Sequence, residues 1–261
     1  MTDDFTNDVA KELVTQTAGK AYDDLVAPSA KPLGTVFSLL PRTIRVWLSK
    51  WEKWVLNGER SIELTAQAIK EKTANIPIEK LTEPEPYVAV PAMQQLSYSF
   101  DSEELREMYA NLLVASMNID TKKYVHPAYV DIIKQLSPDE AKLLKFLALN
   151  PDQPLIDVLL DLPNNGGYFT QVHNFTNIGE GICENPEEIF SYLDNLERLK
   201  LIEIPYGVLL NNNDIYKPLE EHEEIRALLK STVPSGYKYR IQRHKFMLSA
   251  FGKNLIKICL A

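Results

Sequence analysis

Three residues of types that often do chemistry lie close together in the middle of the chain. They are His126, Asp139 and Glu140, within the stretch HPAYVDIIKQLSPDEAKLLKFLAL at 126–149. A histidine can act as a general base or a metal ligand, and two neighbouring carboxyls can be the acid and base of a hydrolase. Each also lies within two residues of a proline at the expected start of a helix, where such groups cap free backbone N–H groups. We therefore expect all three to be architectural rather than reactive.

The other candidates for chemistry form no recognisable set. No imidazole or thiol has the spacing of a zinc site or of a CxxC motif; the scattered residues are His173, His222, His244, Cys183 and Cys259. The NNGG run at 164–167 matches neither phosphate-binding glycine motif and is typical of a mobile loop, and Ser249 lies outside any GxSxG motif. We expect no metal, no cofactor and no small-molecule substrate. An enzymatic activity assembled from distant residues stays open.

The composition is that of a soluble globular protein. The 261 residues are 45% hydrophobic and 25% charged, which is enough for one large core or two smaller ones without disulfides. Two cysteines do not support a disulfide-stapled secreted scaffold, the acidic first residues do not resemble a secretory signal, and no run of 18 apolar residues predicts a spanning helix. We therefore expect a cytoplasmic protein. The net charge of −8 argues against a general nucleic-acid coat.

The N-terminal part, 1–74, is predicted to be helical and contains all three tryptophans. Within 35–56 apolar residues recur every three or four positions, and basic residues occupy much of the remaining surface. Such a helix usually packs into a core or against another copy, but a basic helix with tryptophans can also lie on an anionic membrane or bind a partner. The residues singled out for partner or membrane binding are Trp47, Trp51, Trp54, Arg45 and Lys50.

The middle part, 75–136, is predicted to be a connector followed by a helical core. Four prolines lie in 75–91, which favours an extended connector because proline fixes φ and removes a backbone donor. After it, Asp101 and Glu104 have the spacing of a capping box at the start of a long helix. A further helix is predicted to begin at Pro127.

The C-terminal part, 137–261, is predicted to be a winged-helix-like module with a small β-hairpin, so the whole fold is expected to be mainly α. Ser137, Pro138 and Glu140 predict its first helix. A helix that runs directly into a strand with a return partner is typical of the last helix and wing of such modules. The remaining segments are a Pro-bounded stretch at 155–162, an Asn- and Gly-rich loop at 163–184, a helix capped at Asn185 that enters a strand through LERLKLIE, an insertion with an acidic helix at 211–236, a return strand within 237–252 and a terminal helix capped by Ser249.

The return strand and the terminal helix are basic and could contact a phosphate backbone. The candidate nucleic-acid-binding residues are Lys238, Arg240, Arg243, Lys245 and Lys253. A charged edge strand that avoids edge-to-edge pairing has the same composition. The helix before the wing, PEEIFSYLDNLERLK, carries four acids against two basic residues, which opposes insertion into a DNA groove. We therefore expect a protein partner or self-association, with DNA and a membrane surface as alternatives.

Three strings of the sequence resemble the bacterial abortive infection alpha family. They are EELREMYANLLVASMN, HPAYVDIIKQLSPDEAKLLK and LSAFGKNLIKICL; the resemblance runs from about the Pro-rich connector to the C-terminus and is strongest over 101–145. The family is associated with bacteriophage resistance, so the resemblance implies a cytoplasmic bacterial defence protein. It supplies no catalytic residues. The matching residues are helix starts and apolar faces, which favours a non-enzymatic protein that acts by binding a partner.

Overall fold

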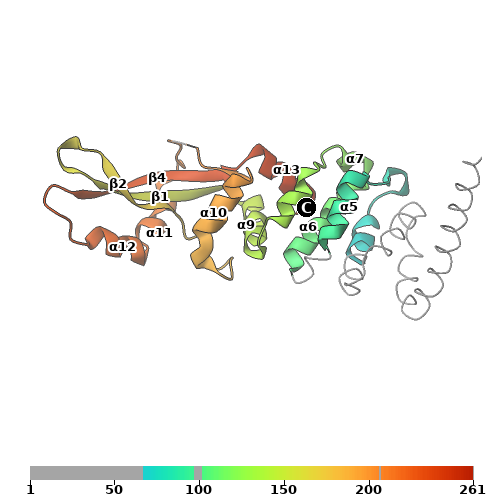
Figure 1. Ribbon diagram of the computed structural model, residues 1–261, viewed down its shortest axis with the longest axis horizontal. Coiled ribbons are helices and arrows are strands. Elements are labelled where there is room, and N and C mark those ends of the chain that lie inside the picture. The colour runs from blue at the N-terminus through green and yellow to red at the C-terminus, as the bar shows by residue number, and fades with distance from the viewer. Residues whose placement is uncertain (1–66, 97–101, 206, 261) are drawn as a thin grey trace, which may run out of the picture.

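The computed structural model describes residues 67–96, 102–205 and 207–260. Helices gather at one end of the molecule and a sheet extends away from them at the other, with α10 (Ile189–Arg198) between the two (Figure 1). The fold is therefore mixed α/β and mainly helical, in keeping with the coarse prediction. The tryptophan-bearing segment, 35–56, lies outside the described residues.

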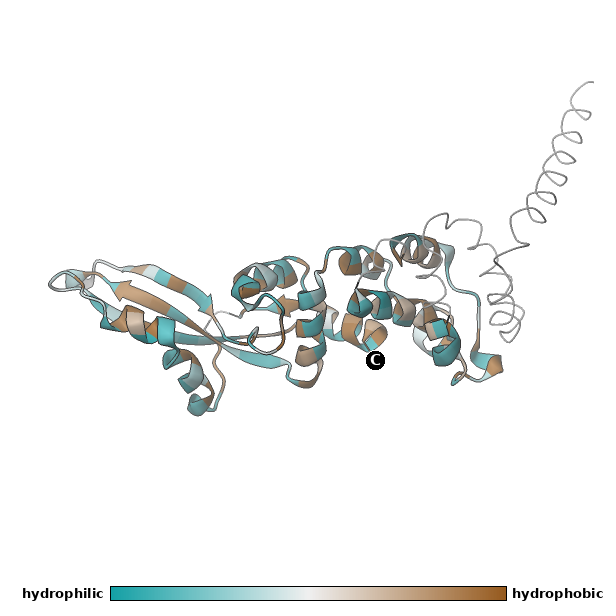
Figure 2. Ribbon diagram, turned by 90° about the horizontal axis from the view of Figure 1, so that it is seen from below, coloured by the Kyte–Doolittle hydropathy of each residue, from teal (hydrophilic) through white to brown (hydrophobic). Residues whose placement is uncertain are grey.

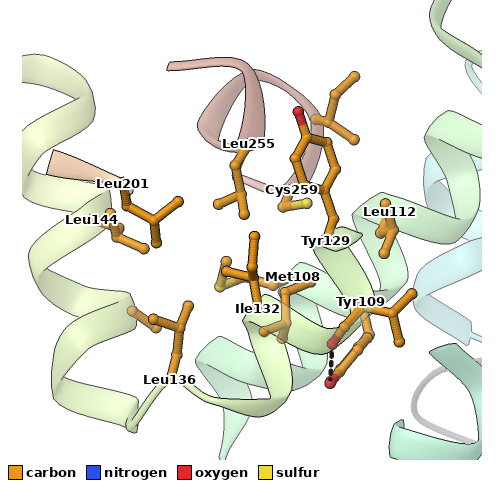
Figure 3. Close-up of a cluster of buried hydrophobic side chains, with 14 of the residues drawn as sticks. Met108, Tyr109, Leu112, Tyr129, Ile132, Leu136, Leu144, Leu201, Leu255 and Cys259 are labelled. Carbon is orange, nitrogen blue, oxygen red and sulfur yellow. Dashed lines mark hydrogen bonds between the residues drawn. The ribbon is translucent and has the colours of Figure 1, made fainter. Parts of the chain in front are cut away.

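The helical end is built from short helices around one core. Hydrophobic and hydrophilic residues alternate along these helices, as expected where one face is buried (Figure 2). Tyr109, Tyr129 and Leu255 meet in this core, and the Tyr109 hydroxyl donates a hydrogen bond to the Val130 carbonyl oxygen at 3.2 Å (Figure 3). The helices are one at 67–73, α5 (Pro86–Leu96), α6 (Glu103–Ser116), α7 (Ile119–Lys122), α8 (Ala128–Lys134), α9 (Pro138–Leu149) and α13 (Ala250–Cys259).

The proline-rich connector is shorter than predicted. After the 3-10 turn η1 (Ile78–Lys80), the chain is non-helical only to residue 85, and α5 begins at Pro86 and includes Pro91. A proline in the first turn of a helix loses no hydrogen bond, and the buried face of α5 stabilises the helix against the proline further in. The prediction of an extended segment is therefore wrong over 86–91.

A four-stranded antiparallel sheet forms the other end of the molecule, in the order β2-β1-β4-β3. β1 pairs with β4 along its whole length, from Asp152 opposite Met247 to Asp161 opposite Lys238. The pairing of β3 with β4, which the sequence predicts as a hairpin, is confirmed but is only two residues long. The strands are β1 (Asp152–Asp161), β2 (Tyr168–Phe175), β3 (Ile202–Glu203) and β4 (Lys238–Leu248).

The loop predicted at 163–184 contains strand β2, so that prediction is wrong over 168–175. The NNGG run is only the turn of the β1–β2 hairpin, which includes the 3-10 turn η2 (Pro163–Asn165). Asn164 and Gly167 have positive φ there, and the Leu162 N–H donates to the Gly167 carbonyl oxygen at 2.9 Å. The Asn and Gly signal thus belongs to the turn, whereas YFTQVHNF, rich in aromatic residues, suits a strand.

The insertion at 211–236 covers one face of the sheet (Figure 1). It forms η4 (Asn213–Tyr216), α11 (Lys217–Glu220) and the predicted acidic helix α12 (Glu223–Lys230). Tyr216, Leu219 and Ile225 of this insertion pack with Ile156 and Val158 of β1 in a second, smaller core. The described part of the chain therefore has two cores, a large one at the helical end and a small one under the sheet.

The predicted caps are confirmed at two helices. Ser137 and Glu140 form a reciprocal capping box at the start of α9. Ser249 caps α13, because its hydroxyl oxygen accepts the N–H of Gly252 at 2.8 Å. Both caps satisfy backbone donors that have no partner inside the helix.

The caps of two other helices differ from the prediction. α6 is capped by Ser102, one residue after the predicted Asp101, and the Ser102 hydroxyl oxygen accepts the N–H of Leu105 at 3.3 Å. The Asn185 side chain makes no capping hydrogen bond at η3 (Pro186–Glu188), the turn before α10. Its backbone N–H donates instead to Asp139, so this helix start is held by a residue distant in the sequence.

Candidate functional site

His126 belongs to a helix start and a cluster of rings. Its Nδ1 accepts the backbone N–H of Ala128 at 3.1 Å. The ring centroid lies 5.9 Å from that of Tyr129 and 5.8 Å from that of Phe251. The imidazole therefore caps and packs, which agrees with the architectural interpretation.

Asp139 is a buried residue of α9 that hydrogen-bonds to the segment leading into α10. Its carboxylate accepts the backbone N–H groups of Glu184 at 2.9 Å and Asn185 at 3.0 Å, together with Lys142 Nζ and the Tyr192 hydroxyl. Burial alone raises the pKa of Asp139, but these four donors lower it to about 2. The carboxylate is therefore ionised and fully engaged at neutral pH, which does not suit a general acid or base.

Glu140 makes a second tie to different partners. Its Oε2 accepts the Ser137 N–H at 2.6 Å, and its Oε1 accepts Asn195 Nδ2 of α10 at 2.7 Å. Asp139 and Glu140 thus each serve their own set of internal donors. None of the hydrogen bonds or ring contacts of His126 involves Asp139 or Glu140, so these contacts do not join the three residues into one group.

Both thiols are held in the protonated form. Burial raises the pKa of the Cys183 thiol to about 11. Burial also raises the pKa of the Cys259 thiol, which is fully buried in the helical core. Because the thiolate is the reactive species, neither cysteine is a suitable nucleophile at neutral pH.

The five basic residues proposed to bind nucleic acid do not form one surface. Successive side chains of a strand point to opposite faces, so Lys238 and Arg240 lie on one face of β4. Arg243 and Lys245 lie on the other face, which the insertion covers in part. Lys253 belongs to α13.

Three of these basic residues are paired with acids. The pairs are Arg240–Asp161, Arg243–Glu220 and Lys245–Asp152. Arg243 uses two guanidinium nitrogens for its carboxylate, which is the strongest geometry for such a pair. Lys238 and Lys253 are exposed and form no ion pair with the residues that the structure describes.

A polar centre that the sequence reasoning missed lies inside the sheet. Asp157 of β1 is only 8% exposed, and its Oδ1 lies 3.1 Å from both His244 Nε2 of β4 and His173 Nδ1 of β2. The same oxygen accepts the backbone N–H of Asn174 at 2.8 Å. Burial alone raises the pKa of Asp157, but the hydrogen bonds from His244 and Asn174 keep it below its ordinary value.

This polar centre fastens the irregular end of β2 to β1. The β1–β2 register shifts on both sides of Val158, and Asn174 has positive φ. His173 and His244 have no hydroxyl or thiol among their hydrogen-bond partners in the described chain, so no activated nucleophile is present there. No group of three or more His, Cys, Asp or Glu side chains among the described residues could hold a metal ion. The only sequence signal for the centre is Asp157, the first of the two acids in the apolar run LIDVLLDL, since a buried charge needs partners.

β2 lies at an open edge of the described sheet. The strand is eight residues long and reads YFTQVHNF, without Asp, Glu, Lys, Arg or Pro. The side chains of Tyr168 and Phe169 are 55% and 56% exposed. The opposite edge, β3, is only two residues long.

The backbone of β2 also points outward at this edge. In an antiparallel ladder, residues alternate between those that bond to the neighbouring strand and those whose N–H and C=O face away from it. The Gly167 carbonyl oxygen accepts the N–H of Leu162 and so bonds toward β1. By alternation, the backbone N–H and C=O groups of Tyr168 and Thr170 face away from β1. The edge can therefore take an added strand from another chain.

The fold and the site define a mainly helical α/β protein with an open sheet edge. The family model described as "Abortive infection alpha" matches residues 57–259, so the chain belongs to the abortive infection alpha family and the resemblance is confirmed. A search of curated proteins found no match. One similar solved structure is an uncharacterised protein of the marine bacterium Alcanivorax borkumensis SK2; it is 19% identical, with a TM-score of 0.35, over 52% of this chain and 96% of that chain.

None of the helices in the described part of the chain combines the length and the hydrophobicity needed to cross a membrane. The residues proposed for membrane or partner binding, Trp47, Trp51, Trp54, Arg45 and Lys50, lie outside the described residues. Their role stays a prediction.

Proposed function

We propose that this chain is a bacterial phage-defence protein without enzymatic activity and that it acts by binding a protein partner along the edge of β2. Membership of the abortive infection alpha family supports the defence role. The observation that carries the binding mode is the eight-residue edge strand itself, which has outward backbone groups, exposed aromatic side chains and no charged residue. Natural sheets usually block such edges with charges, prolines or short strands.

The C-terminal module is proposed to be an elaborated winged helix. The run from α10 into β3 and back through β4, and the order β1-β4-β3, support this interpretation. β2 and the insertion at 211–236 would then be additions to the common plan. The exposed acids of α10 and the turn before it, including Glu187, Glu188 and Asp194, favour a protein partner over DNA.

A phage-protection assay tests the proposed surface. Thr170→Pro removes an N–H that faces outward, so it should leave the sheet intact and block strand addition. We expect cells that carry this variant to lose protection while the purified protein keeps its circular dichroism and melting temperature. The matched control is Thr170→Val, which keeps the backbone donor and should protect like the parent chain. Full protection by a folded Thr170→Pro protein would contradict the proposal.

DNA binding is the second candidate, because Lys238 and Lys253 are exposed and without ion pairs among the described residues. Their replacement together by Glu would then abolish salt-dependent retention of the chain on duplex DNA. If the chain acts through the β2 edge and not through DNA, the parent chain itself should show no retention on duplex DNA. Strong retention that disappears in the double variant, together with loss of phage protection, would favour the DNA-binding function instead.

A further inference from the structure

The two edges of the described sheet differ in their protection. β3 is two residues long and lies against the start of α13, so it offers little backbone to another chain. β2 is eight residues long, and the commonest protective devices, a charged side chain or a proline, are absent from its sequence. An edge of this kind is a template for pairing with any extended strand, and an identical edge is present on every other copy of the chain.

Charge also singles out this edge for contact between copies. The chain carries a net charge of −8, so two copies repel one another over most acidic surfaces. β2 contains no Asp, Glu, Lys or Arg, so pairing two such strands places none of these charged residues opposite one another in any register. Arg240, which lies over the Tyr168 ring at 5.7 Å, is already paired with Asp161.

The geometry selects one register for the contact. Two copies related by a twofold axis can pair only antiparallel, with one residue of β2 opposite itself. Tyr168 and Thr170 face outward, whereas the end of the strand near Asn174 is bent and fastened to Asp157. The regular part of β2 comes before this bend. Within β2, Thr170 is the residue of that regular part that lies closest to the middle of the strand and has outward backbone groups.

We propose that β2 of one copy pairs antiparallel with β2 of a second copy around Thr170, which joins the two sheets into one. The proposal rests on the proposed function, since it names the partner of the same edge. The outer edges of the joined sheet are then the two short β3 strands, so assembly stops at the dimer. Because the paired stretch is short, the dimer should be weak and should form as the protein concentration rises.

A charge-reversal pair tests this contact. Thr170→Lys and Thr170→Glu each place like charges opposite one another across the axis, so each variant alone should be monomeric in sedimentation analysis over a concentration series that dimerises the parent chain. An equal mixture of the two variants places Lys opposite Glu and should restore the dimer. Lys238→Glu, an exposed charge change on β4, is the control and should dimerise like the parent chain. Circular dichroism and melting temperatures confirm that each variant is folded.

Three outcomes would overturn the proposal: a parent chain that stays monomeric throughout, single variants that still dimerise, or a mixture that stays monomeric. The phage-protection assay separates this failure from that of the proposed function. A monomeric parent chain that loses protection on Thr170→Pro would mean that the edge binds a different protein, so the proposed function would stand and the dimer would fall. If the chain dimerises through β2 and the Thr170→Pro variant still protects fully, the dimer proposal would stand and the proposed function would be wrong.

Discussion

The polar groups of the α9–α10 junction have hydrogen-bond partners inside the chain, whereas backbone groups at the β2 edge face outward. At the junction, Asp139 and Glu140 are buried and accept hydrogen bonds from backbone and side-chain donors of three segments. At the edge, Tyr168 and Thr170 direct backbone groups away from the sheet. Both regions belong to the same C-terminal part of the chain.

This difference does not follow the type of residue. The carboxylates look more reactive than Thr170, yet every one of their strong contacts is internal, so they stabilise the fold and have nothing left to offer a ligand. The threonine edge has no chemistry of its own, but its unpaired backbone groups are available to another chain. Open hydrogen-bonding capacity, rather than the identity of the side chain, is therefore the ground on which we propose a binding surface here.

The largest effect is expected where the two ends of the molecule meet. A Cβ atom at Gly252 of α13 would overlap the carbonyl oxygen of Leu201, next to β3. Gly252→Ala should therefore lower the free energy of unfolding by about 3 kcal/mol, because backbone atoms must shift to make room. Chemical denaturation measures this effect. The control is Lys253→Ala at the exposed neighbouring position, which should change stability by less than about 0.5 kcal/mol. If both variants lost the same stability, the close contact of Gly252 with Leu201 would not be the cause.

Asp139→Asn should destabilise the α9–α10 junction. The amide can accept hydrogen bonds at only one of its two terminal atoms, so buried donors lose their partner and the negative charge is gone. We expect a loss of about 2 to 3 kcal/mol in denaturant unfolding. Glu184→Gln, which removes only an exposed partner of Lys142, is the control and should cost less than about 1 kcal/mol. If Asp139→Asn left the stability unchanged, the hydrogen bonds of Asp139 would not stabilise the junction between α9 and α10.

Acid should weaken the same junction. The pKa of Asp139 is about 2 in the folded chain, below its ordinary value of 3.8, so ionised Asp139 stabilises the fold above pH 4 and this contribution is lost as the pH falls through 2. Because each pKa unit corresponds to about 1.4 kcal/mol, the contribution is about 2 kcal/mol. Unfolding curves measured from pH 5 to about pH 2 should be steeper in pH for the parent chain than for Asp139→Asn. Parallel pH profiles would show that another group controls acid stability.

A smaller loss of stability is expected from a change near the β2 edge. Asp157→Asn weakens the hydrogen bonds that fasten the bent part of β2, so stability should fall by about 1 to 2 kcal/mol. Amide exchange at 173–175 should accelerate more than exchange elsewhere in the sheet. Asp161→Asn, which loses only the surface pair with Arg240, is the matched control and should affect stability less. Uniform acceleration across the whole sheet would mean that Asp157 supports the sheet and not β2 in particular.

The features that the sequence predicts well are local ones. Ser137, Pro138 and Glu140 define a helix start within four residues, and the capping box forms as the spacing indicates. The sequence places the cap of α6 one residue too early, because Asp101 and Ser102 are both good caps and stand next to each other.

The features that escaped the sequence analysis depend on pairing between distant segments. Asp157 gains its role from partners on two neighbouring strands, which only the register of the sheet brings together. Arg243 and Glu220 meet because the insertion packs on the face of the sheet that β1 and β4 form. β2 was obscured because the strong Asn and Gly signal of its turn was extended over the following residues, although an aromatic stretch such as YFTQVHNF favours a strand.

Hydrogen exchange of individual amides tests the central contrast most directly. In dilute protein, the amides of Tyr168 and Thr170 should exchange fast, whereas those of Glu184 and Asn185, held by Asp139, should be protected. As the concentration rises, protection should appear at Tyr168 and Thr170 and leave the junction unchanged. New protection that appears elsewhere while β2 keeps exchanging fast would contradict the account.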